Sequence, residues 1–261
     1  MSCLGEKVFD TRTYEQAQAN AGAAIFEKAI SSEWDYRYDF LTTRSWADRF
    51  HEPFLDFGCG VGMALAVFER LGKQVVGFDA SREMLRFARR RCASVPLVLA
   101  DGLHLPFGDK VFSTACVTGV LHHIQDLDGA VEELTRCTRE VVCLNEPCPK
   151  HSRVMRFVSF GLYCVQVFRR KMLGLTRKSS VGEGSYHSRF ERSIDPARLV
   201  GLSRKYGFEP VQVRYFNHLP LLNEFLGVRF RARLFSMLMS SKRGTDSEII
   251  VASSSLAGRR V

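Results

Sequence analysis

A glycine-rich turn between two apolar strands constrains this sequence more than any other feature. Residues 54–62 read Phe-Leu-Asp-Phe-Gly-Cys-Gly-Val-Gly, an apolar strand that runs into three alternate glycines. Glycine lets the backbone turn sharply and approach a ligand at a distance that any Cβ would block. A second apolar run ends in Asp79, 23 positions after Asp56. In a parallel α/β sheet a carboxylate at that point can accept hydrogen bonds from both hydroxyls of a ribose, so the sequence predicts a site for a nucleoside-containing cofactor.

The glycine spacing separates two classes of cofactor. A dinucleotide fingerprint requires Gly-x-Gly-x-x-Gly, and its third glycine would fall where this chain has Met63. The observed pattern is Asp-x-Gly-x-Gly-x-Gly, starting at Asp56. It closely resembles the first motif of the class I S-adenosylmethionine-dependent methyltransferases.

Three more segments resemble later motifs of that family, and they follow in the right order. Residues 79–81 (Asp-Ala-Ser) resemble the second motif, residues 99–102 (Leu-Ala-Asp-Gly) the third, and residues 118–124 the segment after the fourth strand. Together the four motifs span about residues 52–147. Four ordered motifs are far more specific than a single glycine loop.

The resemblance implies S-adenosylmethionine as the cofactor and gives its ligands residue by residue. Asp56 would hold the ammonium group, although an aspartate here could also cap the following helix. We expect Asp79 to bind the ribose, because an unpaired carboxylate after an apolar strand has little structural role. Asp101 would accept from the adenine amino group or bond its own backbone, and Met84 would touch the adenine or pack in the core. The expected cofactor ligands are Asp56, Gly58, Cys59, Gly60, Gly62, Asp79, Ala80, Met84, Asp101, Gly102 and Thr118.

Two adjacent histidines are the candidate catalytic residues. His122 and His123 follow the fourth strand, where the resembled family faces the transferable methyl group. An imidazole with a pKa of about 6.5 suits a general base at neutral pH, but either ring could instead orient the cofactor or cap a helix. The sequence does not rank the further candidates Glu146, Tyr186, His187, Glu191 and His218.

The alternation of apolar strands and helices predicts an α/β fold with a mostly parallel sheet and helices on both faces. The resemblance implies a Rossmann-like seven-stranded sheet in the order 3-2-1-4-5-7-6, with helical lid insertions at the cofactor end. Strands are expected at 54–57, 74–79, 96–100, 111–117, 140–145, 208–216 and 248–253, helices at 13–30, 34–50, 61–71, 82–92, 128–137 and 195–206, and a solvated tail at 254–261.

The expected organisation has four parts. Residues 1–52 form an N-terminal helical cap, and residues 53–147 form the cofactor-binding core. Residues 148–194 form a basic and apolar insertion, interpreted as a lid. Residues 195–261 complete the α/β domain and contain a second insertion at 217–246.

Charge is distributed unevenly. Residues 1–149 carry a net charge of −5, and residues 150–261 carry +14. Within the insertions, residues 150–178 contain eight Lys or Arg and residues 225–243 contain five, with no acid in either range. Basic residues around an apolar stretch suit either contact with an anionic membrane or a lid with solvated arginines, and the lid is preferred.

Composition and cysteine usage agree with a cytoplasmic globular protein. The chain has 46% apolar and 25% charged residues, an N-terminus without an apolar signal, and no apolar run long enough to cross a bilayer. Its eight cysteines include no Cys-x-x-Cys pair, so we expect buried free thiols and no metal site. Membrane contact, if made, would place it peripherally at the inner membrane face.

The sequence therefore predicts a methyltransferase that acts on an oxygen or carbon centre of an apolar or amphipathic small molecule, lipid-linked acceptors included. The small-molecule subgroup, which includes quinone-type C-methyltransferases, is the nearest match, although the family's usual Lys-Pro-Gly-Gly turn is missing at residues 136–140. The fourth strand is not followed by the Asn/Asp-Pro-Pro-aromatic signature of amino-group methylation, and Cys148 follows the wrong strand for a cytosine-C5 nucleophile. Two alternatives remain: an RNA methyltransferase, which the basic half would suit, and a catalytically silent cofactor-binding scaffold.

Overall fold

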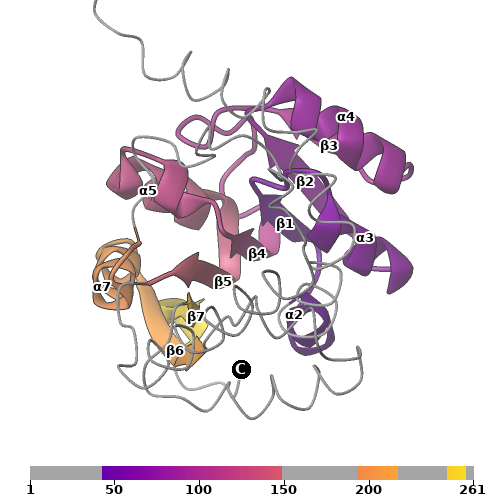
Figure 1. Cartoon of the computed structure of the whole chain (residues 1–261). Helices are drawn as coiled ribbons and strands as arrows, with labels where there is room; N and C mark the ends of the chain where they lie inside the picture. The colour runs from indigo at the N-terminus through magenta and orange to yellow at the C-terminus, as the bar shows by residue number, and fades with distance from the viewer. Residues whose placement is uncertain (1–42, 149–192, 217–245, 257–261) are drawn as a thin grey trace, which may run out of the picture.

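The computed structural model describes residues 43–148, 193–216 and 246–256. Within them, seven strands form one sheet in the order β3-β2-β1-β4-β5-β7-β6 (Figure 1). The predicted Rossmann-like α/β fold is thereby confirmed. The strands are β1 (Phe54–Phe57), β2 (Val75–Asp79), β3 (Leu97–Leu99), β4 (Phe112–Thr118), β5 (Thr138–Pro147), β6 (Phe208–Phe216) and β7 (Asp246–Ser253).

The helices begin where the sequence offers capping side chains. Helices α4, α5 and α7 follow Ser81, Asp126 and Asp195, and each of these side chains accepts a hydrogen bond from a backbone N–H of the first turn. Among the described residues, no helix is both long enough and apolar enough to cross a membrane. The helices are α2 (Thr43–Arg49), α3 (Met63–Arg70), α4 (Arg82–Arg91), α5 (Leu127–Cys137) and α7 (Pro196–Lys205), with short 3-10 helices η2 (Leu121–His123) and η4 (Ser254–Leu256).

Strand directions bring the polar strand ends to one edge. Strands β3, β2, β1, β4 and β5 are mutually parallel, and β7 lies antiparallel between β5 and β6. The carboxyl ends of the parallel strands therefore meet at the same edge of the sheet. In open α/β sheets this edge is where ligands bind.

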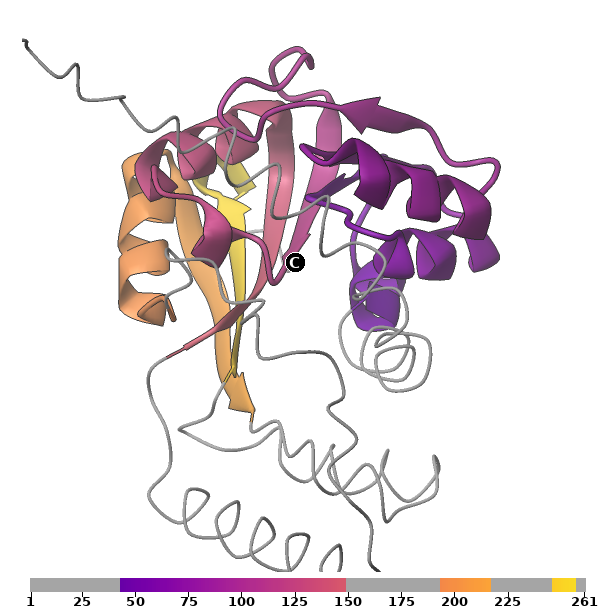
Figure 2. The same ribbon diagram turned by 45° about the horizontal axis from the view of Figure 1, so that its top comes forward.

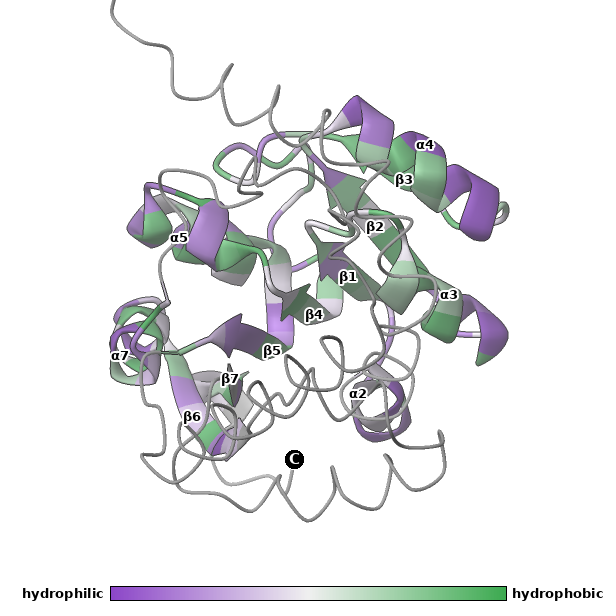
Figure 3. Cartoon of the chain, in the orientation of Figure 1, coloured by the Kyte–Doolittle hydropathy of each residue, from purple (hydrophilic) through white to green (hydrophobic). Residues whose placement is uncertain are grey.

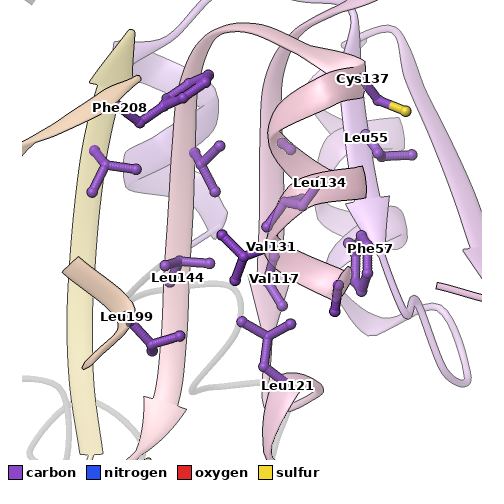
Figure 4. Close-up of a cluster of buried hydrophobic side chains, with 14 of the residues drawn as sticks. Leu55, Phe57, Val117, Leu121, Val131, Leu134, Cys137, Leu144, Leu199 and Phe208 are labelled. Atoms are coloured by element: carbon purple, nitrogen blue, oxygen red, sulfur yellow. The ribbon is translucent and has the colours of Figure 1, made fainter. Parts of the chain in front are cut away.

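Each face of the sheet buries its own apolar cluster. Alternate residues of β1 divide between the two clusters: Phe54 packs with α2, α3 and α4, and Leu55 and Phe57 pack with α5 and α7. Figure 2 shows the two helical layers on opposite sides of the sheet, and Figure 4 shows the second cluster. Figure 3 shows hydrophobic strands beneath the largely hydrophilic α4. The two apolar clusters, one on each face of the sheet, together hold the edge loops in place.

Several predicted boundaries shift for identifiable reasons. Helix α3 begins at Met63, because Gly62 has a φ of 81° and cannot be part of the helix. Strand β5 runs on to Pro147, since it pairs with β7 as far as Asp246. The expected solvated tail begins with ordered residues: residues 254–256 form η4, in which Ser254 and Ser255 are exposed, and the Ser254 N–H donates to the Gly207 carbonyl at 2.8 Å.

The described part of the N-terminal cap is anchored to the sheet. Trp46 on α2 is fully buried, and its Nε1–H donates to Oε1 of Glu248 on β7 at 3.0 Å. Outside the described residues lie the helix predicted at 13–30, almost all of both insertions, and the candidates Tyr186, His187, Glu191 and His218.

Candidate cofactor and acceptor site

The glycine turn joins β1 to α3 at the carboxyl edge of the sheet. A Cβ on Gly58, whose φ is 70°, would lie 2.6 Å from the side chain of Val120, so the segment after β4 packs directly on this turn. A Cβ on Gly60 would meet nothing within 4 Å, which leaves open space beside the loop. Cys59 fixes the turn to the next strand, because its N–H donates to the Phe78 carbonyl at 2.8 Å.

Asp79, at the end of β2, fastens this turn. Its Oδ2 accepts from the Gly60 N–H at 2.9 Å, and its Oδ1 accepts from the Ser81 N–H at 2.8 Å. The expectation of an unpaired carboxylate is therefore wrong, because the main chain of the two motifs already supplies donors. A carboxylate has about four lone-pair sites, so two ribose hydroxyls can still bond to it. Burial raises the pKa of Asp79, and these N–H bonds oppose the rise.

Asp56 on β1 is the most perturbed acid of the described residues. Its side chain is 3% exposed, and its Oδ2 has no hydrogen-bond partner there. Burial, and then the nearby Asp79, raise the pKa of Asp56 to about 7. Leaving a buried acceptor unpaired costs about 1–3 kcal/mol. A cationic ammonium group would remove this cost, so Asp56 fits the role expected of it.

The second and third motifs reach the same edge. Ala80 is exposed beside Asp79, and the Ala100 N–H donates to the Asp79 carbonyl at 3.2 Å. Met84 is 8% exposed and belongs to the apolar cluster around α3, which favours the core interpretation weighed for it. Its contact with adenine stays a prediction.

The third motif forms a tight turn. Asp101 Oδ1 accepts from the Leu103 N–H at 3.0 Å, so this aspartate does bond its own backbone, and 43% of its side chain is exposed. Gly102 packs against the ring of Phe57, which a Cβ would approach to 2.9 Å. All four sequence motifs are thus brought together at one edge.

A buried carboxylate organises the segment that follows β4. Glu146 on β5 is fully buried, and its Oε1 accepts from the N–H groups of Val120 and Leu121 at 2.8 Å each. Its Oε2 lies 2.8 Å from Nδ1 of His122. The same carboxyl group thus contacts two backbone N–H groups and one ring nitrogen, and it can accept from Nδ1 of His122 in the tautomer that has its proton there.

The two histidines stack on one another. Their ring centroids are 3.9 Å apart, and the His123 N–H donates to the Val120 carbonyl at 3.0 Å. The Glu146 carboxylate selects the His122 tautomer in which Nε2 is the proton acceptor. The sequence did not rank Glu146 above the other candidates. Its signal was a charged residue just beyond the apolar run 141–144, separated from it by Asn145.

A polar row lies on the face of the sheet opposite Glu146, and the sequence singled out only one of its members, Thr118, as an expected cofactor ligand. Thr118 on β4, Asn145 on β5 and Glu248 on β7 are opposite one another in register. Within the described residues, Thr118 Oγ1 and both polar side-chain atoms of Asn145 are buried without a hydrogen-bond partner. Glu248 accepts from Trp46, and its Oε2 accepts from Gln212 at 2.8 Å. A polar residue that ends an apolar strand was again the available signal.

The described cysteines are structural. All six are free and buried, and burial raises the pKa of the Cys59 and Cys116 thiols well above the usual range. Over residues 43–148, 193–216 and 246–256, no three His, Cys, Asp or Glu side chains are grouped to hold a metal ion.

Comparison with known proteins agrees with this geometry. A family model described as a methyltransferase domain matches residues 55–141. A demethylmenaquinone methyltransferase of Streptomyces griseus subsp. griseus is 29% identical over 148 residues, which are 51% of this chain and 64% of the relative. These matches support the predicted resemblance of the chain to the class I S-adenosylmethionine-dependent methyltransferases. S-adenosylmethionine as the cofactor and the roles of single residues stay predictions.

A further relative and a solved structure extend the comparison. A demethylmenaquinone methyltransferase of Thermobifida fusca is 39% identical over 101 residues, which are 35% of this chain and 43% of the relative. The matches thus cover less than two thirds of these curated relatives. Magnesium protoporphyrin IX methyltransferase from Synechocystis PCC 6803, solved with bound SAH, has a TM-score of 0.59 at 14% identity and covers 94% of this chain and 100% of that one. At this identity the likeness shows the fold alone.

Proposed function

We propose that this methyltransferase transfers a methyl group from S-adenosylmethionine to an oxygen or carbon centre of an apolar or amphipathic small molecule. Asp56, with its unpartnered Oδ2, would hold the ammonium group, and Asp79 would hold the ribose hydroxyls. The open space beside Gly60 would admit the cofactor. When bound, the cofactor supplies a methyl group activated by attachment to a sulfonium.

The observation that carries the proposal is the pair of His122 and Glu146 beside the glycine turn. Val120, which packs on Gly58, belongs to the same short segment as His122, so the imidazole stands near the cofactor loop. Glu146 orients the ring and stabilises the imidazolium that forms when Nε2 accepts a proton. Proton removal is needed when the acceptor is a hydroxyl or an acidic carbon. The remaining task is to hold the acceptor atom about 3 Å from the methyl carbon.

An apolar acceptor is favoured by two observations. The curated relatives reported above are named for demethylmenaquinone, a quinone-type substrate. In addition, the insertions at 148–194 and 217–246 combine apolar stretches with basic residues and would lie over the acceptor side as lids. The acceptor is therefore proposed to be apolar or lipid-linked, with the insertions as lids; peripheral contact of the insertions with an anionic membrane is the alternative to a lid.

The test is transfer of labelled methyl groups into apolar product. The chain is incubated with methyl-labelled S-adenosylmethionine and a set of apolar phenols and hydroquinones, and label is counted after solvent extraction. We expect His122→Ala to lower turnover about a hundredfold or more, with little change in affinity for S-adenosylhomocysteine. His51→Ala is the matched control, because the side chain of this histidine is 81% exposed and, among the described contacts, pairs only with Glu140, at 2.9 Å. Equal losses of turnover and cofactor affinity would assign His122 to cofactor positioning.

The same assay separates the alternatives. The net charge of +14 on residues 150–261 is the observation that favours RNA, because cations can follow a phosphate backbone. Label recovered in RNA and absent from every apolar extract would support that alternative. Binding of S-adenosylhomocysteine without transfer to either class of acceptor would support a silent scaffold.

A further inference from the structure

Thr118 and Asn145 lie side by side at the carboxyl edge of the sheet, on the face that α2 and α3 cover. They are opposite one another in register, and so are Cys116 and Cys143, which lie two residues earlier on the same strands. Both cysteines belong to the apolar cluster of that face. Val117 pairs with Phe57, so Thr118 stands level with Gly58, the first residue of the glycine turn. The two polar side chains are therefore beside the cofactor loop and one or two strands away from Asp56.

No described part of the chain satisfies these groups. Asn145 is 2% exposed, and within residues 43–148, 193–216 and 246–256 its Nδ2 and Oδ1 have no hydrogen-bond partner, like Oγ1 of Thr118. Glu248, which is opposite Asn145 in register, accepts from Trp46 and Gln212 instead. The main-chain carbonyl of Asn145, by contrast, accepts a hydrogen bond from the Gly119 N–H at 2.8 Å. Buried polar groups are almost always hydrogen-bonded, so these three atoms indicate a missing partner.

We propose that Asn145 and Thr118 bind an uncharged oxygen-bearing group, a hydroxyl or a carbonyl, of the methyl acceptor. This rests on the proposed function for the presence of an acceptor. The row runs from Thr118 toward β7, away from the carboxylates of β1 and β2 that serve the cofactor. The Asn145 side chain offers an NH2 donor and a carbonyl acceptor, and the Thr118 hydroxyl can donate or accept. Together they can bind a hydroxyl group, which donates and accepts, or a carbonyl group, which accepts. The buried Glu248 carboxylate beside Asn145 disfavours an anionic group.

The test compares the acceptor kinetics of two variants with a control on the same strand. Asn145→Leu and Thr118→Val keep side-chain volume and remove the polar atoms. Thr114→Val makes the same change on the same strand and face, but at the opposite end, where Thr114 Oγ1 donates to the His51 carbonyl at 2.8 Å. We expect Asn145→Leu to raise the KM for an oxygenated acceptor about tenfold or more, and Thr118→Val to raise it less. Asn145→Leu should keep the affinity for S-adenosylhomocysteine and the Tm of the wild type, or gain in Tm.

Thr114→Val should show the opposite pattern, with a lower Tm and an unchanged KM. An unchanged KM in Asn145→Leu would overturn the proposal, because the amide would then serve only the fold or a buried water. A loss of affinity for S-adenosylhomocysteine as large as the change in KM would also overturn it, since the two residues would then belong to the cofactor site.

A binding measurement keeps this inference separate from the proposed function. The complex with S-adenosylhomocysteine is titrated with 2-naphthol and with naphthalene, which differ by one hydroxyl and cannot report on catalysis. We expect the wild type to bind 2-naphthol about tenfold or more tightly than naphthalene, and Asn145→Leu to lose this preference. That result would support the inference even if no methyl transfer were found. An equal preference in wild type and variant would contradict it, whatever the assay of methyl transfer shows.

Discussion

Asp56 combines deep burial with an unpartnered oxygen, and both properties predict a pH dependence of cofactor binding. In the unliganded protein the pKa of Asp56 is about 7, whereas a bound ammonium group would lower it. Binding near pH 6.5 should therefore release a proton, and affinity should rise with pH up to about 8. Calorimetry in two buffers with different ionisation enthalpies measures this proton. A binding heat that does not depend on the buffer would contradict the role of Asp56.

The same carboxylate predicts a change in stability. Its folded pKa of about 7 lies above its ordinary value of 3.8, so the free energy of unfolding should fall as pH rises through that interval and level off above it. Asp56→Asn should remove this slope and abolish cofactor binding. At pH 8 it should raise the free energy of unfolding by at most about 4 kcal/mol, which would be seen as a higher Tm. Thermal unfolding at pH 5 and pH 8 is the measurement. An equal pH dependence in wild type and variant would show that Asp56 is ionised in the folded state.

At the scale of single residues, the sequence predicted which residues meet at the site but not their hydrogen-bond partners. The spacing of Asp56, the glycines and Asp79 follows from local strand and turn patterns, which are visible along the chain. The partners of Asp79 and Glu146 are backbone N–H groups, which depend on the conformation of the turns. The polar row at Asn145 depends on strand pairing across the sheet, which no local pattern shows.

At the scale of elements, helix α2 is joined to the sheet by a single buried hydrogen bond. Trp46→Phe would keep most of the ring but remove the Nε1–H donor, leaving one oxygen of the buried Glu248 unpaired. We expect a loss of about 1–3 kcal/mol of stability, seen as a lower Tm. Tyr206→Phe is the control, because it removes an aromatic donor from more exposed bonds to Asp128 and Glu132. Equal Tm values for the two variants would contradict this role of Trp46.

Most elements were predicted within two residues of their observed ends. Buried parallel strands are nearly continuous apolar runs, and helices with capping residues have recognisable starts. The sheet order came from the family resemblance, since the antiparallel insertion of β7 between β5 and β6 leaves no local trace. The contact of α2 with β7 joins residues 202 positions apart, so it could not be read from the chain.

At the scale of the whole molecule, the uneven charge predicts a partner for the basic half. Cations near an anionic bilayer contribute about 1 kcal/mol each, and apolar side chains add to this only when they enter the interface. Replacing Phe157 and Phe160 with Ser should therefore weaken sedimentation with vesicles of phosphatidylcholine and phosphatidylglycerol, and should leave RNA retention unchanged. The control replaces Val111 and Val211 with Ser, because these side chains are 48% and 46% exposed on the surface of the α/β domain. If the wild type ignores such vesicles and the Phe variant stays fully active, the insertion is a packed lid.

The central claim is that the glycine turn and the two aspartates form a site for S-adenosylmethionine. Calorimetric titration of the full chain with S-adenosylhomocysteine and with NAD tests it directly, in the wild type and in Asp79→Ala. The account predicts one site for S-adenosylhomocysteine, weakened by about 2–3 kcal/mol in the variant, which loses both the ribose bonds and the contact with Gly60. Tight binding of NAD, or equal affinity of wild type and Asp79→Ala for S-adenosylhomocysteine, would contradict it.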